Sequence, residues 1–400
     1  MGVPRFEPFS AVRYDHSRVE PADVLAPPYD VIGADELQRL ESRSPYNVVH
    51  IDLARDDPAR NRYDAARCRM QEWIEAGVLL RDDEPAFYLY RMGWHDEDGR
   101  PLQTTGVLGA LALDPERSGQ VLPHERTMAK PMDDRLRLMR ACRANLSPIW
   151  GLSLGTGLDA VAPPPEGPLL RVTDDGGVHH RLWRLSGRGT IETVQASVGA
   201  GPVVIADGHH RYETALAYQA ERRAAGAGAG PHDLTLAFVS DLASMEAGVR
   251  PIHRLIGGLP EHFPVREAMA ASFLLLPVPG GPEALPGLMV ARGGLGLVVG
   301  REAYVLQPRV TAGETVDSEL LELALTPFPA HTTRYHHDVA EVLALLDKGE
   351  AQAAVLLRPT SVGQIEAAAR EGRRLPQKST FFHPKPRTGV AFRLLDEPPL

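Results

Sequence analysis

The densest set of reactive side chains in this sequence is the string DGHHR at positions 207–211. It follows the apolar run VVIA and precedes Tyr212, Ala215, Leu216 and Tyr218, which are spaced like one face of a helix. The string is therefore predicted to lie where a strand ends and a helix begins. At such a place free backbone N–H groups and the positive end of the helix dipole attract an anion.

Each residue type in DGHHR suits a phosphate group. Gly208 allows the backbone to approach a ligand closely, and Arg211 offers a guanidinium fork that matches phosphate oxygens. His210 is expected to donate to the same phosphate, while Asp207 and His209 are candidates for acid–base catalysis. The structural alternative is that Asp207 caps the helix, Arg211 pairs with a neighbouring acid and both histidines face solvent.

A second polar cluster, HERT at 124–127, precedes another helical pattern. His124 and Glu125 are candidates for catalysis, and Arg126 is a candidate ligand for a nucleotide phosphate. The string lacks the second histidine of HExxH, so it does not predict a zinc-protease site, and we assign no metal ligands. A polar loop with local ion pairs is the alternative interpretation.

Shorter strings contribute further candidates. Lys378, in LPQKST, is a candidate phosphate ligand, although the glycines of the phosphate loop GxxxxGK(S/T) are absent. Tyr29 and Asp30 follow a rigid di-proline, and His253 and Arg254 lie in RPIHRL; all four are candidates for substrate binding. A structural turn explains Tyr29 and Asp30 equally well. No GxSxG elbow, GxGxxG loop or protein-kinase signature occurs, so the common hydrolase, dehydrogenase and protein-kinase interpretations lose support.

The 400-residue chain carries 43 basic and 52 acidic residues, a formal net charge of −9. A modestly acidic chain with 43% hydrophobic residues is expected to be globular and is poorly suited to nucleic acid or to membranes. No apolar run approaches the roughly 18 residues of a membrane span. Cys68 and Cys142 form no disulfide or zinc pattern. These features predict a cytoplasmic protein without membrane or nucleic-acid partners.

The elements that must position these residues alternate between strand and helix patterns, which predicts a mixed α/β (α+β) fold. We expect a main α/β domain over residues 1–259, which carries DGHHR, and a C-terminal α+β unit over 260–400 that packs against it. The histidine pairs at 179–180 and 336–337 have no carboxylate or cysteine at useful spacing and are expected at the surface. Strands are predicted at 48–53, 86–92, 106–113, 148–154, 180–185, 203–206 and 234–239, and helices at 34–41, 60–76, 133–145 and 209–225.

Several long strings together resemble one family. APPYDVI, SPYNVVHIDL, VLPHERTMAKPMDDRL, ADGHHRYETALAY, RPIHRL and LPQKSTFFHPK are similar to the domain-of-unknown-function 1015 family of bacteria and archaea, over Phe6 to Phe392. More distantly, the DGHHR turn resembles the ParB/sulfiredoxin fold, in which a glycine-containing turn with a basic dyad binds nucleotide phosphate. That superfamily includes a free serine kinase that phosphorylates L-serine from ADP or ATP. The resemblance implies a ParB/sulfiredoxin-like nucleotide-binding core with additional α+β elements.

These observations lead to three alternative functions. The first is a phosphotransferase that uses ATP or ADP with Mg²⁺ to phosphorylate a small hydroxylated metabolite, with L-serine as the named candidate. Glu125 or Asp207 would be the general base, and His124, Arg126 and Lys378 would stabilise the transferring charge. The others are a nucleotide-binding regulatory protein without catalysis and a phosphohydrolase. The expected partners are a nucleotide and a small substrate, and a homodimer is a candidate assembly.

Overall fold

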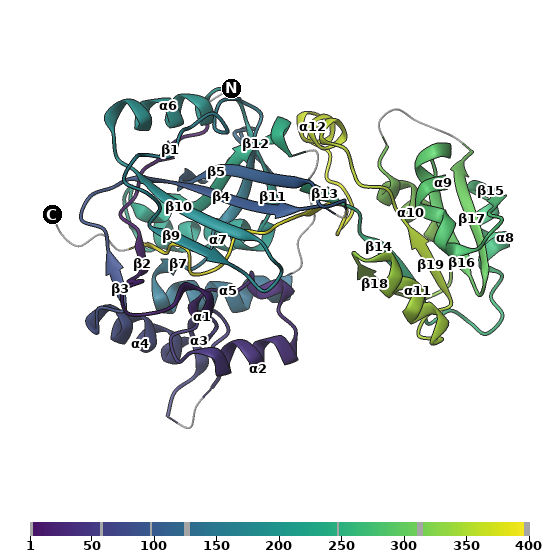
Figure 1. The fold of residues 1–400 in the computed structure, drawn as a ribbon, viewed down its shortest axis with the longest axis horizontal. Helices are drawn as coiled ribbons and strands as arrows, with labels where there is room; N and C mark the ends of the chain where they lie inside the picture. Colours follow the sequence, from purple (N-terminus) through teal and green to yellow (C-terminus); the bar gives the residue numbers. More distant parts are fainter. Residues whose placement is uncertain are drawn as a thin grey trace. The chain divides into compact units, whose positions relative to one another are not determined.

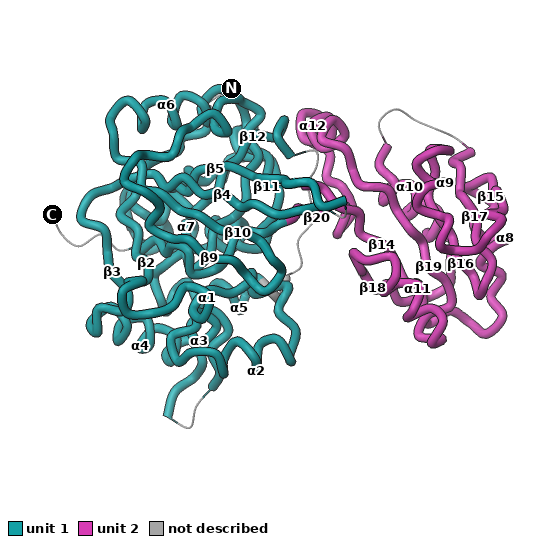
Figure 2. The backbone as a smooth tube through the Cα atoms, in the orientation of Figure 1, with its two compact units in different colours: residues 1–123, 127–245, 384–400 teal, residues 124–126, 246–383 magenta. Residues whose placement is uncertain are grey.

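The computed structural model describes residues 3–56, 59–96, 98–123, 129–245, 248–309 and 315–395, with the side chains of 129–131 excepted. The chain forms two compact units (Figure 2): the first spans 1–123, 127–245 and 384–400, and the second spans 124–126 and 246–383. This division differs from the expected boundary at residue 260. The second unit begins its main segment at residue 246, and residues 384–400 belong to the first unit.

The first unit is built on a nine-stranded sheet whose order is β6-β11-β8-β12-β5-β4-β10-β9, with β1 beside β5 (Figure 1). β11 runs parallel to β6, and β12 runs parallel to β8, while the other neighbours are antiparallel. A mixed sheet with helices confirms the predicted α/β class. The strands are β1 Phe6–Glu7, β4 Phe87–His95, β5 Pro101–Ala112, β6 Val121–Pro123, β8 Ile149–Ser153, β9 Leu170–Thr173, β10 His179–Leu185, β11 Val203–Asp207 and β12 Leu234–Asp241.

Helices cover this sheet, with α6 on one side and α2, α3 and α4 on the other in Figure 1. The apolar face predicted for 209–225 is confirmed, because Tyr212 and Ala215 of α7 pack into the same core as Val203, Ile205 and Val239. Burying each large apolar side chain stabilises the fold by about 1.5–3 kcal/mol. The helices are α1 Pro21–Val24, α2 Ala34–Arg43, α3 Val49–Asp52, α4 Arg62–Glu75, α5 Ala129–Cys142, α6 Arg188–Gly199 and α7 His209–Ala224; two short strand pairs, β2 Val12–Tyr14 with β3 Leu79–Arg81 and β7 Ala144–Asn145 with β21 Arg393–Leu394, complete the unit.

The second unit contains a six-stranded antiparallel sheet in the order β15-β17-β16-β19-β14-β18. Strand alternation sends neighbours to opposite faces, so Leu297 joins one core cluster and Val298 the other. The elements are β14 His253–Gly257, α8 Val265–Ala270, β15 Phe273–Pro277, α9 Leu285–Arg292, β16 Leu295–Val299, β17 Glu302–Pro308, α10 Asp317–Leu325, β18 Thr332–His336, α11 Val339–Asp347, β19 Ala353–Leu356 and α12 Val362–Arg370, with the pair β13 Val249–Arg250 and β20 Phe381–Phe382.

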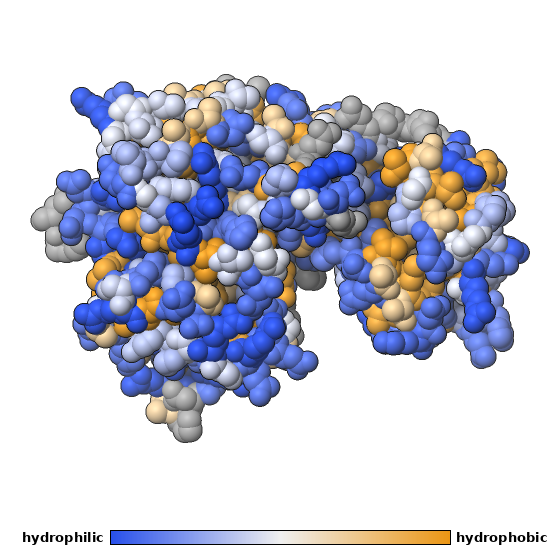
Figure 3. Space-filling view, in the orientation of Figure 1, coloured by the Kyte–Doolittle hydropathy of each residue, from blue (hydrophilic) through white to orange (hydrophobic). Residues whose placement is uncertain are grey.

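The surface is mostly hydrophilic on the visible face of each unit, with apolar patches more extensive on the second (Figure 3). Leu274, Val290 and Leu323 are exposed apolar side chains of that unit. No helix in the described ranges combines the length and the apolar character needed to cross a bilayer.

Two sequence predictions are wrong. The strand expected at 48–53 is the short helix α3, because the Asn47 carboxamide accepts from Val49 N at 3.1 Å and starts a helical turn that buries Val49 and Ile51. Local capping and burial outweigh the β preference of branched side chains here. His180, expected at the surface, is 1% exposed, because it alternates with exposed His179 along β10 and therefore faces inward.

Gly109, in the central strand β5, tests the packing of this sheet. A Cβ atom there would lie 2.7 Å from the Phe87 ring and closer still to the ring of Phe6, and both rings are buried. We expect Gly109→Ala to lower the free energy of unfolding by about 1–3 kcal/mol, the usual cost of overpacking. Urea denaturation followed by circular dichroism measures this change.

The matched control is Gly93→Ala on the neighbouring strand β4, where the added Cβ would meet only Leu102 O, at 3.8 Å. We expect the control to stay within about 0.5 kcal/mol of wild type, as for most substitutions without a steric conflict. Equal destabilisation by the two variants would contradict the packing described for Gly109.

Candidate functional site

The turn between β11 and α7 has the geometry that the sequence predicts. Gly208 adopts a left-handed backbone conformation with φ 88° and is the N-cap residue of α7, with no side-chain cap. A Cβ atom at this position would lie 3.0 Å from the guanidinium of Arg211. Glycine is therefore favoured twice, by its conformational freedom and by the close approach of Arg211.

Asp207, at the end of β11, pairs with two cations. Its Oδ2 lies 2.5 Å from Nη2 of Arg211, and its Oδ1 accepts from Nζ of Lys385. The side chains of Asp207, Arg211 and Lys385 are only 15%, 11% and 12% exposed. We name these three residues the ion triad. Arg211 also donates to the carbonyl of Pro148.

The triad fixes the charge state of its members. Burial alone would raise the pKa of Asp207, but the positive charges of Lys385 and Arg211 outweigh it and hold this pKa well below the ordinary range. Burial lowers the pKa of Lys385, whereas Asp207 and Asp30 more than restore it, so the net shift is upward. Asp207 is therefore ionised and forms two ion pairs. Its low pKa makes it a weak base, and its charge holds the side chains of Arg211 and Lys385 in place.

Tyr29 and Asp30, two residues predicted to bind substrate, lie in the electrostatic environment of the triad. The guanidinium carbon of Arg135 lies over the Tyr29 ring, 4.3 Å from the ring centroid. Burial raises the pKa of Tyr29 to about 12, against the opposing charge of Arg211. Asp30 is exposed, and its negative charge raises the pKa values of Arg211 and Lys385. The structure thus brings Tyr29 and Asp30 to the same region as 207–211.

A second buried ion cluster adjoins the triad. Arg135 donates from Nη1 to Asp52 Oδ1 at 2.9 Å and from Nη2 to Asp134 Oδ2 at 2.6 Å. The Tyr63 hydroxyl donates to Asp134 Oδ1 at 2.9 Å. Burial raises the pKa of Asp52, with the nearby cations Arg135 and Arg211 opposing the shift.

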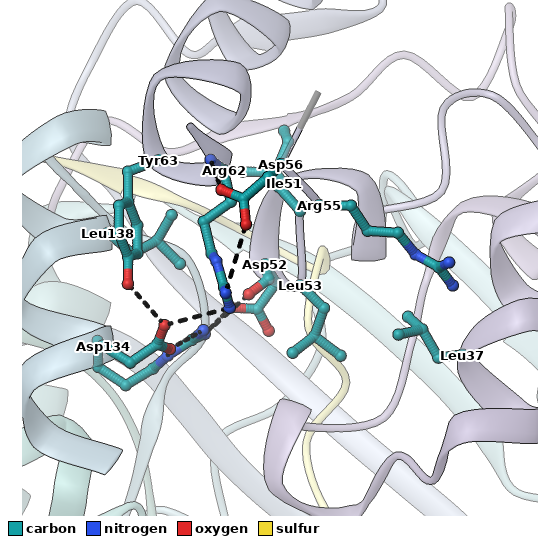
Figure 4. A pocket seen from close by; sticks show the side chains of 12 residues that line it. Leu37, Ile51, Asp52, Leu53, Arg55, Asp56, Arg62, Tyr63, Asp134 and Leu138 are labelled. Carbon is teal, nitrogen blue, oxygen red and sulfur yellow. Dashed lines mark hydrogen bonds and ion pairs between the residues drawn. The ribbon is translucent and has the colours of Figure 1, made fainter. Parts of the chain in front are cut away.

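Cavities lie on both sides of Arg135. One of about 40 Å³ separates it from Arg211 and is lined also by Tyr29 and Ser147. The other, of about 380 Å³, opens where Arg62 and Tyr63 point toward Asp134 and Arg55 extends away (Figure 4). Its apolar walls come from Leu37, Ile51, Leu53 and Leu138.

The histidines of DGHHR have different environments. His209 is buried, and its positive charge would lower the pKa of Asp207. His210 is half-buried at the start of α7, and its carbonyl accepts from Thr214 Oγ1 at 2.7 Å. His209 therefore does not face solvent, in contrast to the structural alternative in which both histidines would.

Three further predicted site residues, His124, Glu125 and Arg126, lie outside the described residues. In the sequence they follow β6, whose last residue Pro123 pairs in register with Ile205 of β11. Within the described ranges, no three His, Cys, Asp or Glu side chains gather in a way that could hold a metal ion.

The second unit holds the three remaining candidates. Nη2 of Arg254 donates to the carbonyl of Lys378 at 2.8 Å, which brings these two residues together, although the Lys378 side chain is exposed. His253 is buried, and its Nδ1 accepts from Leu357 N at 3.2 Å. Burial lowers the pKa of His253 to about 4, so it is neutral at physiological pH.

A family model described as a protein of unknown function, DUF1015, matches residues 6–357. The chain belongs to the DUF1015 family. The search of curated proteins found no match to this chain. The matched range contains DGHHR and ends before Lys378 and Lys385, so the lysine of the triad lies beyond it.

Solved structures with a similar chain course include a free serine kinase in complex with AMP, 14% identical, with a TM-score of 0.38 over 69% of this chain and 86% of that one. A conserved hypothetical protein from Pyrococcus furiosus is 13% identical, with a TM-score of 0.38 over 72% of this chain and 95% of that one. SbnI from Staphylococcus aureus, with a C-terminal truncation, is 10% identical, with a TM-score of 0.36 over 70% of this chain and 85% of that one.

Sequence reasoning did not select Lys385 as a site residue. It is separated from Asp207 by 178 positions, and only the return of the last residues to the first unit brings the two together. The available signal was a lysine in LPQKSTFFHPK, a string already singled out by its resemblance to the family. A single lysine in such a segment does not specify which carboxylate it meets.

The triad makes a testable prediction about stability. Asp207→Asn leaves two buried cations without their common anion, so we expect a loss of about 3–5 kcal/mol in the free energy of unfolding. Lys385→Met keeps the pair of Asp207 with Arg211, and we expect a smaller loss of about 1.5–3 kcal/mol, the value of one charged hydrogen bond. Urea denaturation at pH 7 gives both values.

The same comparison at low pH tests the charge on Asp207. Because its folded-state pKa is lowered, its contribution is complete above the unfolded pKa of about 3.9 and is lost as pH falls through the lower folded value. The gap between wild type and Asp207→Asn should therefore shrink by about 1 kcal/mol between pH 7 and pH 3. A gap that is unchanged, or a larger loss from Lys385→Met than from Asp207→Asn, would refute the arrangement.

Proposed function

We propose that the ion triad and the start of α7 bind the phosphate groups of a nucleotide, and that the protein transfers a phosphoryl group to a small hydroxylated metabolite. L-Serine is the first acceptor to test, because the DGHHR turn resembles that of a free serine kinase. The observation that carries the proposal is the triad itself: two buried cations surround one carboxylate beside a glycine N-cap without a side-chain cap.

This arrangement suits an anion for electrostatic reasons. The triad has an excess of one positive charge in a place with little water, where the attraction for an incoming phosphate is less screened than at the surface. The first-turn N–H groups of α7 add the positive end of the helix dipole. Asp207 holds the two cations in place before the ligand arrives, which reduces the cost of ordering them.

Four residues predicted from the sequence, together with Lys385, take separate roles in this proposal. Gly208 and Arg211 contact the phosphate, and His210 donates to it from the outer side of the turn. Lys385 joins them as a further cation. Because Asp207 is engaged in two ion pairs, Glu125 is the better candidate for general base.

A Mg²⁺ ion would suit this site if it arrived together with the nucleotide phosphates. It retains most of its water and usually needs only one or two protein carboxylates. Asp30 is an exposed carboxylate whose charge acts on both cations of the triad, so it is the described residue best suited to hold such an ion. The metal would neutralise charge on the phosphates while the protein groups orient them.

Nucleotide binding is the first test. We expect isothermal titration calorimetry to show binding of ADP or ATP, strengthened by Mg²⁺, and Arg211→Lys to weaken it at least about tenfold because lysine lacks the guanidinium fork. The matched control is Arg188→Lys, an exposed arginine in the first turn of α6, which should bind like wild type. Equal effects of the two variants, or no binding of any adenine nucleotide, would contradict the proposed phosphate site.

Phosphoryl transfer is the second test. Incubation with ATP or ADP and L-serine should yield phosphoserine, detected by mass spectrometry. Glu125→Gln should lower this rate at least about a hundredfold, as expected for a general base, with nucleotide affinity kept. Phosphate release without an acceptor would indicate a phosphohydrolase, and binding without turnover would indicate a regulatory protein; either result would overturn the kinase assignment and leave the phosphate site standing.

A further inference from the structure

The second unit has a large cavity of its own, independent of the ion triad. It has a volume of about 680 Å³, within the usual range of small-molecule pockets. Its walls come from β14, α10, β18, the loop between α10 and β18, and the segment before β20, all within the second unit. We name it the β18 pocket.

One wall of the β18 pocket is an aromatic platform. Tyr335 is 41% exposed and lies directly opposite Arg254 in the β14–β18 register, so the two side chains share a face of the sheet. The Arg254 guanidinium carbon lies 4.6 Å from the centroid of the Tyr335 ring. Arg254 is 5% exposed and donates to the carbonyls of Ile252 and Lys378 at 2.6 and 2.8 Å. It therefore supports the ring from within the fold, in a fixed orientation.

The rest of the lining combines apolar surface with hydrogen-bonding groups. Phe328 and His331 meet edge to face with ring centroids 6.2 Å apart. Nδ1 of His331 contacts the carbonyl of Pro329 at 2.8 Å, and a carbonyl can only accept, so Nδ1 is the donor and Nε2 is the ring nitrogen that can accept from a ligand. Glu322 supplies a carboxylate to the same lining, and Thr333 supplies a hydroxyl.

We propose that the β18 pocket binds a planar heteroaromatic ring with an exocyclic amino group, as in an adenine or cytosine nucleoside. The exposed ring of Tyr335 offers a surface on which a base can stack. The acceptors of His331 and Glu322 favour an amino donor at the ring edge and disfavour a ligand with a negative charge. This site does not depend on the proposed phosphate site, because it needs no phosphate and uses no residue of the first unit.

The test compares nucleosides, which lack phosphate, in titrations of the full-length chain. We expect adenosine to bind, and inosine, in which an oxygen replaces the amino group, to bind at least about fivefold more weakly because the acceptors of His331 and Glu322 lose their donor. Tyr335→Ala should weaken adenosine at least about fivefold, and Tyr335→Phe should retain binding because the ring remains. Glu322→Gln should reduce the preference for adenosine over inosine.

Two further variants serve as controls. Leu323→Ala changes an exposed side chain of α10 that does not line the pocket and should bind adenosine like wild type. Arg211→Lys should also keep the affinity for adenosine, whereas the proposed phosphate site predicts that this variant binds ADP more weakly. No adenosine binding at millimolar concentration, equal affinities for adenosine and inosine, or a loss that follows Arg211 and not Tyr335 would overturn the inference. The proposed phosphate site is judged separately, by the binding of ADP and its weakening in Arg211→Lys.

Discussion

The site of the first unit depends on the two ion pairs that the ionised carboxylate of Asp207 forms. A charge buried at this level is stable only if opposite charges and hydrogen bonds surround it, and Arg211 and Lys385 meet that requirement from two distant parts of the chain. Arg211 comes from the same turn, four residues later, whereas Lys385 comes from the segment that follows the second unit. The single carboxylate therefore joins the strand–turn–helix to the end of the chain.

The segment that carries Lys385 is held by its own network. Arg387 donates to Asp174 Oδ2 at 2.6 Å, and the same oxygen accepts from His180 Nε2 at 3.0 Å. Burial lowers the pKa of His180, so its neutral ring accepts at Nδ1 from the Tyr90 hydroxyl at 2.8 Å. Thr388 exchanges backbone hydrogen bonds with Ala26, close to the Tyr29 turn. The position of Lys385 is thus set by sheet residues and by the first loop together.

Local features of this site could be predicted from sequence, whereas long-range ones could not. An apolar run, a glycine and helical spacing define the β11–α7 turn within sixteen residues, so the location of DGHHR follows from local pattern alone. The pairing of Lys385 with Asp207 depends on how the chain returns after the second unit, which no local pattern encodes. His180 shows the same limit: its partners Tyr90 and Asp174 come from neighbouring strands and turns, and the HH string alone is typical of a surface pair.

The triad also constrains which residue can act as a base. A carboxylate that removes a proton must gain it at the expense of its existing interactions, and for Asp207 that means weakening two buried ion pairs. Those same ion pairs are what keep Arg211 and Lys385 oriented toward one place, so protonating Asp207 would release the cations at the moment when charge develops on a phosphate. Organising the cations and accepting the proton are therefore incompatible tasks for one residue. The chemistry proposed for this site therefore needs a separate carboxylate, and our proposal assigns that role to Glu125, which follows β6 in the sequence.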